Sequence, residues 1–259
     1  MITLLSPAKK LNLSSPKAGL STTQPIFNLE TIELTKVVKK QSVEDLKKLM
    51  HLSDNLAQLN ADRFKAFNLD GFSNSSKPAG LTFDGNVYWG LQANSLNEND
   101  LNYAQIHLRI LSGLYGILKP LDLIQPYRLE MGTKLKTKRG NSLYEFWGNK
   151  IANSLNADLC NHTEKTIVNL ASNEYFKAID KDTLETKVVS AKFLNIKDGQ
   201  AKNIMYYAKF GRGLMARWII QNKVNSVEDL KQFNLDDYKY DLNLSNELEF
   251  VFTRQQPVK

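Results

Sequence analysis

The pattern of apolar and polar residues along the chain predicts both strands and helices. Short apolar runs at residues 1–5, 166–170 and 249–253 have the length and composition of buried strands. Helices are predicted where apolar residues recur near helical spacing, which occurs at residues 29–40, 42–50, 53–67, 142–155 and 209–222.

Local signals define some boundaries of these elements. Ser42 precedes two acidic residues, and Ser142 precedes Glu145 by three residues, so both serines are predicted to cap helices. Turn sequences at 84–86 and 197–199 separate apolar runs and predict two β-hairpins. Strands and helices alternate without a regular βαβ order. We therefore expect one α+β domain over residues 1–259, with a mixed β-sheet surrounded by helices.

Composition excludes several classes of protein. No apolar run approaches the roughly 18 residues that a membrane span needs, so no membrane partner is expected. Cys160 is the one cysteine, and the three histidines share no ligand spacing with it, so no zinc or other metal site is expected. Phosphate-loop and dinucleotide-binding fingerprints are absent from the sequence, so we predict no cofactor. A cytoplasmic monomer is the expectation.

Positive charge is concentrated in two segments. The chain carries a net charge of +7, of which residues 101–150 contribute +5 and residues 192–223 contribute +6, while the rest is net negative. Five of the seven arginines also lie there: Arg109, Arg128, Arg139, Arg212 and Arg217. Such clustering attracts phosphate groups and predicts a positively charged cleft. The alternative is that the basic residues only promote solubility.

The segment 97–124 predicts a helix-hairpin-helix element. Apolar residues recur at helical intervals at Leu101, Ala104, Leu108 and Leu111. Gly113 and Gly116 follow, and glycines at such a turn let backbone N–H groups approach a DNA phosphate. Arg109 and Lys119 would add positive charge. A plain glycine-capped helix end is the alternative, and Pro120 interrupts the second helix.

Three further segments carry candidate chemistry. Arg128 and Glu130 share one face of an extended segment, either as a buried ion pair or as a phosphate-binding arginine beside a general base. Glu174 lies where a predicted strand meets a helix, in a capping motif or at a site. Lys9 follows the first strand and could reach a site at its carboxyl end.

The predicted helix 209–222 has a basic arc. Lys209, Arg212 and Arg217 fall within about 140° at 100° per residue. Gly211 and Gly213 weaken the helix but permit close packing. The arc predicts one wall of a positive groove, or, alternatively, only a solvated basic face.

Together these segments resemble one known family, the YaaA peroxide stress proteins. The resemblance rests on SPAKKL from residue 6, VYWGLQA from 87, the stretch from His107 to Gly132, LYEFWG from 143, NLASNEYFK from 169 and YAKFGRGLMARWII from 207. It implies a cytoplasmic protein that protects cells against hydrogen peroxide and lowers free intracellular iron. It also implies a fold with a helix-hairpin-helix element and a positive cleft that binds DNA.

The sequence therefore predicts a DNA-binding protein that contacts mainly phosphates. The predicted DNA-binding residues are Lys9, Arg109, Gly113, Gly116, Lys119, Arg128, Lys209, Arg212 and Arg217. The alternative is an enzyme acting on a nucleotide or a nucleic-acid base in the same cleft, with Glu130 or Glu174 as the acid or base. An iron-binding protein is disfavoured because no cluster of carboxylates and histidines is evident.

Overall fold

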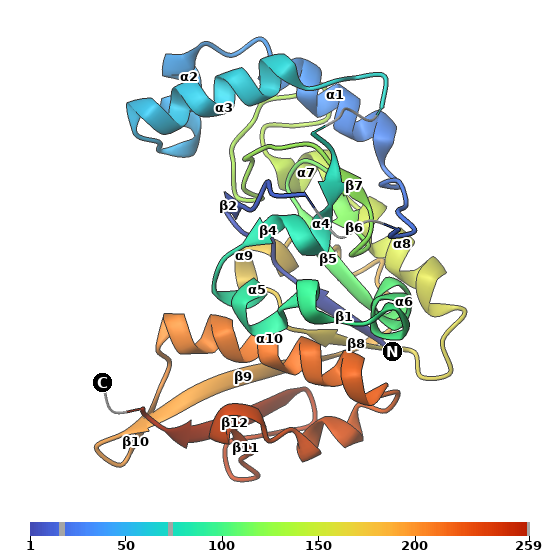
Figure 1. Cartoon of the computed structure of the whole chain (residues 1–259), viewed down its shortest axis with the longest axis vertical. Helices are drawn as coiled ribbons and strands as arrows, with labels where there is room; N and C mark the ends of the chain where they lie inside the picture. Colours follow the sequence, from blue (N-terminus) through green and yellow to red (C-terminus); the bar gives the residue numbers. More distant parts are fainter. Residues whose placement is uncertain (16–18, 72–74, 258–259) are drawn as a thin grey trace.

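One mixed sheet of eight strands forms the centre of the chain, whose computed structural model describes residues 1–15, 19–71 and 75–257 (Figure 1). The strand order is β11-β12-β9-β8-β1-β5-β6, and β10 pairs with β9. The strands are β1 (Ile2–Leu5), β5 (Leu108–Ser112), β6 (Gly116–Leu118), β8 (Thr166–Asn169), β9 (Lys187–Lys197), β10 (Gln200–Lys202), β11 (Lys239–Tyr240) and β12 (Glu249–Gln255). Two shorter sheets pair β2 (Lys10–Leu11) with β4 (Phe83–Asp84) and β3 (Lys77–Pro78) with β7 (Leu123–Ile124).

The five inner strands β5, β1, β8, β9 and β12 are mutually parallel. Their carboxyl ends consequently lie at one edge of the sheet. The chain adds β5 on one side of β1 and then β8, β9 and β12 on the other, so the direction of winding reverses between β1 and β8. In open sheets of this kind, ligands bind beyond the carboxyl ends of the strands at that reversal.

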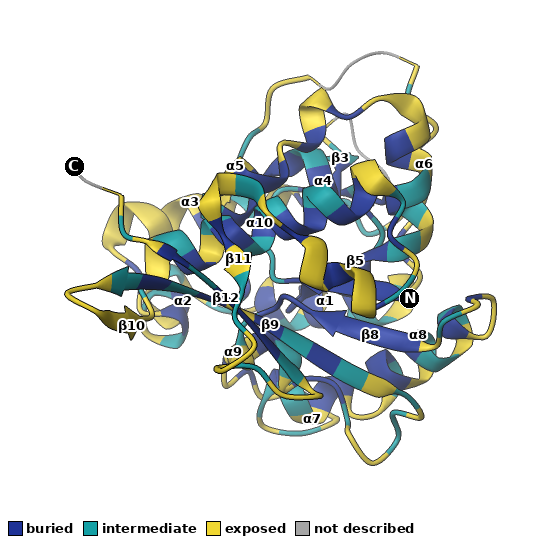
Figure 2. Cartoon of the chain, turned by 90° about the horizontal axis from the view of Figure 1, so that it is seen from below, coloured by how far each residue is buried: buried dark blue, intermediate teal, exposed yellow. Residues whose placement is uncertain are grey.

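Helices cover both faces of the sheet. Figure 2 shows α5, α6 and α10 on one face and α7 and α9 on the other, while α1, α2 and α3 lie together beyond one end of the sheet in Figure 1. The helices are α1 (Asn28–Val38), α2 (Val43–Met50), α3 (Asp54–Ala66), α4 (Ala79–Thr82), α5 (Asn86–Leu91), α6 (Glu98–His107), α7 (Leu143–Trp147), α8 (Lys150–Leu159), α9 (Asn173–Phe176) and α10 (Met205–Asn222), with short 3-10 turns at Ala93–Ser95, Glu228–Gln232 and Leu235–Asp237. This arrangement confirms the expected mixed sheet flanked by helices.

Most local predictions agree with the structure. The three predicted strands are β1, β8 and β12, and all four residues of β1 and of β8 are buried, as expected for strands covered on both faces. Ser42 forms a capping box with Asp45 at the start of α2. The hairpin around residues 197–199 is the β9–β10 pair, although its second arm is short because α10 begins at Met205.

The predicted hairpin around residues 84–86 is wrong. Phe83 and Asp84 pair with β2, and the chain then enters helix α5 at Asn86. Apolar runs on both sides of a turn sequence do not distinguish a second strand from a short buried helix. The buried side chains of Val87 and Tyr88 are compatible with either element.

The predicted helix-hairpin-helix at 97–124 is also wrong. Helix α6 ends at His107, and the following residues form β5, a tight turn and the antiparallel strand β6. All five residues of β5 are buried, and the strand pairs with β1. A buried strand shows no strict alternation of apolar and polar residues, and Leu108 and Leu111 of β5 therefore also satisfy helical spacing. The segment is thus a β-hairpin inside the sheet.

The start of β1 is buried against two histidines. The α-amino group of Met1 lies 3.0 Å from His162 Nδ1, and His107 Nδ1 lies 3.0 Å from the Met1 carbonyl oxygen. Burial, followed by the positive charge of the α-amino group, lowers the pKa of His162 to about 4. Burial also lowers the pKa of His107. Both rings are therefore neutral in the folded protein near pH 7.

We expect His162 to make the fold sensitive to acid. Its pKa is lower in the folded state than in the unfolded chain, so the unfolded state binds the proton more readily. The contribution of His162 to the free energy of unfolding is then full above the unfolded pKa of about 6.5, and it is lost progressively as the pH drops toward 4. Chemical denaturation at a series of pH values should show a shallower loss for His162→Gln than for the wild type between pH 6.5 and 4.

The exposed His51 provides the matched control. His51→Gln should follow the wild-type profile. Equal slopes for the wild type and His162→Gln would show that the contact between His162 and the start of β1 contributes nothing to the acid response.

Within the described ranges, no helix combines the length and the apolar character required to cross a bilayer.

Candidate functional site at the strand ends

Three of the segments singled out in the sequence meet at the carboxyl ends of β1 and β8. The backbone N–H of Ser172 donates to Ser6 Oγ at 2.8 Å, which joins the residues that follow the two strands. Lys9 Nζ lies 3.3 Å from Glu130 Oε1, and the N–H of Gly132 donates to Glu174 Oε1 at 3.0 Å. The strand-end site is defined here as Ser6, Lys9, Arg128, Glu130, Ser172 and Glu174.

Glu130 has two carboxylate oxygens in different surroundings. Oε1 accepts hydrogen bonds from Arg128 Nε at 3.0 Å and Nη2 at 2.9 Å, and it also contacts Lys9. Oε2 is buried and has no hydrogen-bond partner within the described part of the chain. The ion pair considered for Arg128 and Glu130 is thus present, between side chains that are 14% and 16% exposed. The second oxygen can additionally accept a hydrogen bond or a proton from a bound molecule.

Glu174 holds the turn at Gly132 in place. Its side chain is exposed, and its backbone carbonyl accepts a hydrogen bond from the Tyr144 hydroxyl at 3.0 Å. The Cβ of any residue other than glycine at position 132 would lie 3.3 Å from Glu174 Oε1, which is closer than ordinary contact. The carboxylate therefore reaches the backbone of the 130–133 turn because Gly132 leaves room for it.

Three buried tyrosines surround the strand-end site. The Tyr88 hydroxyl donates to the Ser6 carbonyl at 3.0 Å, and the Tyr127 hydroxyl lies 2.6 Å from Ser112 Oγ. Burial raises the pKa of Tyr88, Tyr127 and Tyr175, and the neighbouring tyrosine and glutamate charges raise it further. The hydroxyls are therefore protonated. Because the rings of Tyr127 and Tyr175 are buried, they do not form an exposed surface on which a nucleic-acid base could stack.

Arg63 of α3 brings a further positive charge near this site. Partial burial lowers the pKa of its guanidinium, and the positive charge of Arg128 lowers it further. The two arginines therefore lie close enough to repel each other. No acidic partner of Arg63 occurs among the residues that the structure describes.

Arg212 is partly buried on α10, between Gly211, which faces the sheet, and Gly213, which faces α5. A side chain on the preceding Gly211 would meet the Phe193 ring of β9 at 2.7 Å, and one on the following Gly213 would overlap the backbone of Val87 in α5. The helical neighbours of Arg212 at positions 208, 215 and 216 are all buried. The guanidinium has no hydrogen bond or ion pair in the described ranges, and burial lowers its pKa.

The predicted basic arc of α10 is not an open surface. Gly213 lets α5 and α10 pack together closely, so the part of the arc that includes Arg217 faces α5. Arg217 Nη1 donates to the carbonyls of Leu91 and Gln92 at 3.0 and 3.1 Å, so it caps the end of α5. Lys209 alone of the three is exposed.

The residues predicted around the 97–124 hairpin have packing roles in this fold. Arg109 is 4% exposed, binds Asp158 at 2.7 Å and donates to the carbonyls of Gln105, Ile106 and Leu108. A side chain on Gly113 would overlap the Leu129 backbone, and one on Gly116, whose φ is +71°, would lie 2.7 Å from the Trp147 ring. Lys119 is half-buried. With no helical hairpin here, the geometry that suggested phosphate contacts from these glycines is lost.

A row of exposed lysines extends from the strand-end site. Thr133 and Leu135 are buried, whereas Lys134, Lys136 and Lys138 are exposed, so the segment alternates between inner and outer positions. None of the three lysines forms an ion pair with a residue that the structure describes. We call Lys134, Lys136 and Lys138 the lysine row. The period-two pattern of KLKTK could have revealed it in the sequence.

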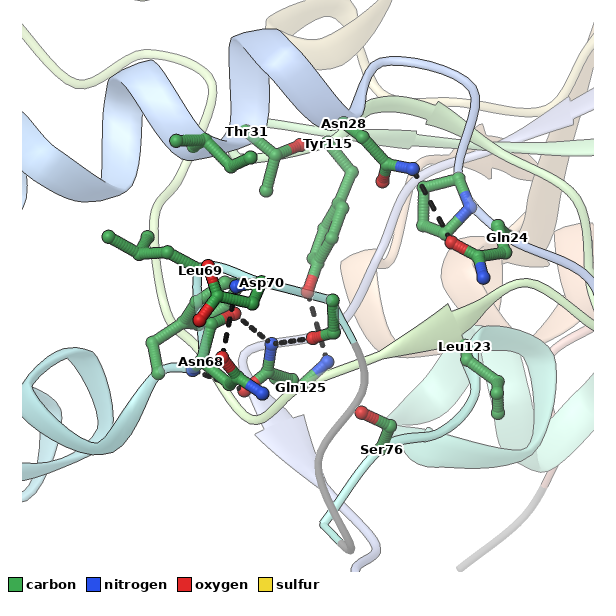
Figure 3. A pocket seen from close by; sticks show the side chains of 14 residues that line it. Gln24, Asn28, Thr31, Asn68, Leu69, Asp70, Ser76, Tyr115, Leu123 and Gln125 are labelled. Atoms are coloured by element: carbon green, nitrogen blue, oxygen red, sulfur yellow. Dashed lines mark hydrogen bonds between the residues drawn. The ribbon is translucent and has the colours of Figure 1, made fainter.

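A cavity of about 190 Å³ lies elsewhere, between α1 and residues 67–71 (Figure 3). Its polar groups are largely paired with one another. Gln125 Nε2 donates to the carbonyls of Asn68 and Gly71 at 2.8 and 3.0 Å, and the Gln125 N–H donates to the Tyr115 hydroxyl at 2.9 Å. None of the predicted site residues lines this cavity.

Over residues 1–15, 19–71 and 75–257, no three histidine, cysteine, aspartate or glutamate side chains gather closely enough to hold a metal ion.

Comparison with known proteins gives consistent matches along the chain. A family model described as peroxide stress protein YaaA matches residues 1–244. The chain is 49% identical to a UPF0246 protein of Phenylobacterium zucineum over 99% of this chain and 96% of that protein. It is 48% identical to UPF0246 proteins of Maricaulis maris, over 99% and 97%, and of Aliivibrio fischeri, over the full length of both chains.

Proposed function

The chain belongs to the YaaA family of peroxide stress proteins, and from this premise we propose that it protects DNA during peroxide stress by binding the phosphate backbone. The lysine row is the observation that carries the proposal. Three ammonium groups with no acidic partner among the described residues project from one segment, Lys134 and Lys136 from its alternating part and Lys138 from the turn that the Thr137–Gly140 bridge closes. Residues at alternate positions of an extended chain lie about 6.6–6.8 Å apart, close to the spacing of phosphates along a nucleic-acid strand.

Other positive groups continue the lysine row toward the strand-end site. Arg128 and Lys9 lie at the beginning of the same region, and Arg63 lies near Arg128. The segment 101–150, which contains the row, has a net charge of +5. Backbone contacts of this kind give binding that depends weakly on base sequence and strongly on salt.

This mode of binding also connects DNA to iron. Cations condense around a DNA duplex, and lysines that neutralise phosphates release them. Ferrous iron held at phosphates would be released in the same way, so hydroxyl radicals would form less often beside the DNA. The proposal also includes the lower free iron that the resemblance implies, within a cytoplasmic protein; this is a separate effect, because displacement from DNA moves iron away from the phosphates without removing it from the free pool.

The triple variant Lys134→Gln, Lys136→Gln, Lys138→Gln tests the lysine row. Removing three phosphate contacts should reduce the slope of log affinity against log salt by about 2.7. On going from about 50 to 200 mM salt, the variant should then lose roughly 40-fold less affinity than the wild type. Fluorescence anisotropy with a labelled duplex of about 20 base pairs at a series of salt concentrations measures both slopes.

A matched control changes the same total charge elsewhere. Lys165, Lys181 and Lys187 are exposed and lie in the segment 151–191, whose net charge is −2. Their triple replacement by glutamine should keep the wild-type salt slope. If both triple variants lower the slope equally, general positive charge binds DNA, and the lysine row is not the contact surface.

A second candidate function is an enzyme that acts on a nucleotide or a nucleic-acid base. The observation that favours it is the meeting of Glu130 and Glu174 in one strand-end site. Glu130 Oε2 is buried with no donor among the described residues, and such an oxygen can take a proton from a bound molecule.

A further inference from the structure

Arg212 carries a charge that the described part of the protein leaves uncompensated. Burial of a guanidinium costs several kcal/mol unless an anion or several acceptors replace the lost water. Arg109 and Arg217 have such partners, since Arg109 binds Asp158 and Arg217 binds carbonyl oxygens, whereas the partly buried Arg63 near Arg128 has no acidic partner among the described residues either. The contrast indicates that the partner of Arg212 is supplied from outside the chain.

The strand register places Arg212 close to the strand-end site. Asn169 at the end of β8 pairs with Ser190 of β9, and Phe193 lies three residues further along β9. Gly211 packs against Phe193, so this turn of α10 lies beyond the carboxyl ends of β8 and β1. Helix α5, which packs against α10, also connects the turn around Arg212 to the strand-end site. Val87 contacts Gly213, and the adjacent Tyr88 donates to the Ser6 carbonyl.

Glu130 approaches the strand ends from the other side. It is bound to Lys9, which follows β1, and its segment is tied to Glu174 at the start of α9. Helix α9 lies on the opposite face of the sheet from α10 (Figure 2). Arg212, which has no partner among the described residues, and Glu130 Oε2, which is buried without one, thus lie on elements that approach the reversal between β1 and β8 from opposite faces.

From this juxtaposition we propose that the strand-end site binds a nucleoside monophosphate, with Arg212 holding the phosphate and Glu130 Oε2 accepting a hydrogen bond from the nucleoside. A ligand that satisfies both groups must carry an anion at one end and an N–H or O–H donor at the other. Nucleotides have this combination, and a guanidinium fork matches phosphate oxygens. The proposal deepens the second candidate function and rests on it, while DNA binding by the lysine row is independent of it.

Calorimetric titration of the full chain with nucleoside 5′-monophosphates tests the site, with inorganic phosphate and adenosine as partial ligands. At least one monophosphate should bind more tightly than phosphate or adenosine. Arg212→Gln should weaken both the monophosphate and phosphate at least about tenfold, a difference of about 1.4 kcal/mol. Glu130→Gln should weaken the monophosphate relative to phosphate, because only the nucleoside contacts Oε2, whereas loss of the negative charge beside Arg128 and Lys9 does not weaken phosphate.

Lys209→Gln is the matched control for charge, since Lys209 is exposed on the same helix one turn before Arg212. It should bind the monophosphate as the wild type does. Without ligand, Arg212→Gln should melt no lower than the wild type, because the replaced group has no partner among the described residues. A structural arginine would instead give a lower melting temperature.

Three results would overturn the proposal: no binding of any monophosphate by the wild type, wild-type binding by Arg212→Gln, or equal weakening by Lys209→Gln. The DNA proposal is measured separately on the same proteins. Arg212→Gln should retain the wild-type salt slope for duplex DNA, and the lysine-row variant should retain monophosphate binding. Loss of monophosphate binding with an unchanged salt slope therefore concerns only the nucleotide proposal, and a changed salt slope with intact monophosphate binding concerns only the DNA proposal.

Discussion

Gly213→Ala is expected to lower the melting temperature by roughly 6–12 °C, since it should cost at least about 3 kcal/mol of stability. A Cβ at position 213 would overlap the Val87 carbonyl oxygen and lie 2.8 Å from its carbon and 2.9 Å from the Leu91 nitrogen. These are backbone atoms of α5, which cannot rotate away as a side chain can. Gly90 of α5 faces the same crossing from the other helix. Alanine favours an isolated helix by about 1 kcal/mol over glycine, and the overlap outweighs that gain.

Thermal denaturation followed by circular dichroism measures this effect. Gly85→Ala is the control, because its Cβ would meet only the Ala8 methyl at 3.2 Å and its φ of 175° is extended backbone open to any residue. It should shift the melting temperature much less. If Gly213→Ala melts at or above the wild-type temperature, α5 and α10 are further apart than the structure places them.

Arg109→Met is expected to have the second large effect, a decrease of about 3–4 kcal/mol in the free energy of unfolding. The guanidinium is 4% exposed and joins Asp158 to three carbonyls at the end of α6, so its removal leaves these acceptors unpaired. The loss from such a buried network exceeds the apolar gain of methionine. DNA binding by the folded fraction should be unchanged, since Arg109 lies inside the fold.

Urea denaturation gives the free energies for this comparison. Arg139→Met is the control, because Arg139 is about one-third exposed and pairs with Glu30 and Glu33 at the surface, where ion pairs contribute about 0–1 kcal/mol. A loss for Arg109→Met no larger than that for Arg139→Met would mean that Asp158 and the carbonyls find other partners.

The sequence was sufficient to predict those elements whose conformation depends on residues adjacent in the chain. Strand β1 is apolar except for the β-branched Thr3, and α2 begins with a capping box, so both could be predicted from local pattern. The segment 108–112 could not, because pairing with β1, more than 100 residues earlier, makes it a strand. The same burial that decides its conformation removes the alternation that would have marked a half-buried strand.

The candidate site was predicted in part. Residue type and spacing pointed to Arg128, Glu130 and Glu174, and these do converge with Lys9. Charge alone could not distinguish arginines with different surroundings. Arg109 and Arg217 bind backbone carbonyls, whereas Arg212 has no partner among the described residues, and this difference arises from helix packing between distant parts of the chain.

The alternating segment that contains Arg128 and Glu130 also carries the lysine row, so the two proposed ligands share one stretch of backbone. The turn at Gly132, tied to Glu174, lies between them. Thermodynamic linkage then requires reciprocity: the factor by which a nucleotide changes the affinity for DNA equals the factor by which DNA changes the affinity for the nucleotide. Under the two proposals, occupancy of one site would therefore be expressed as a change of affinity at the other.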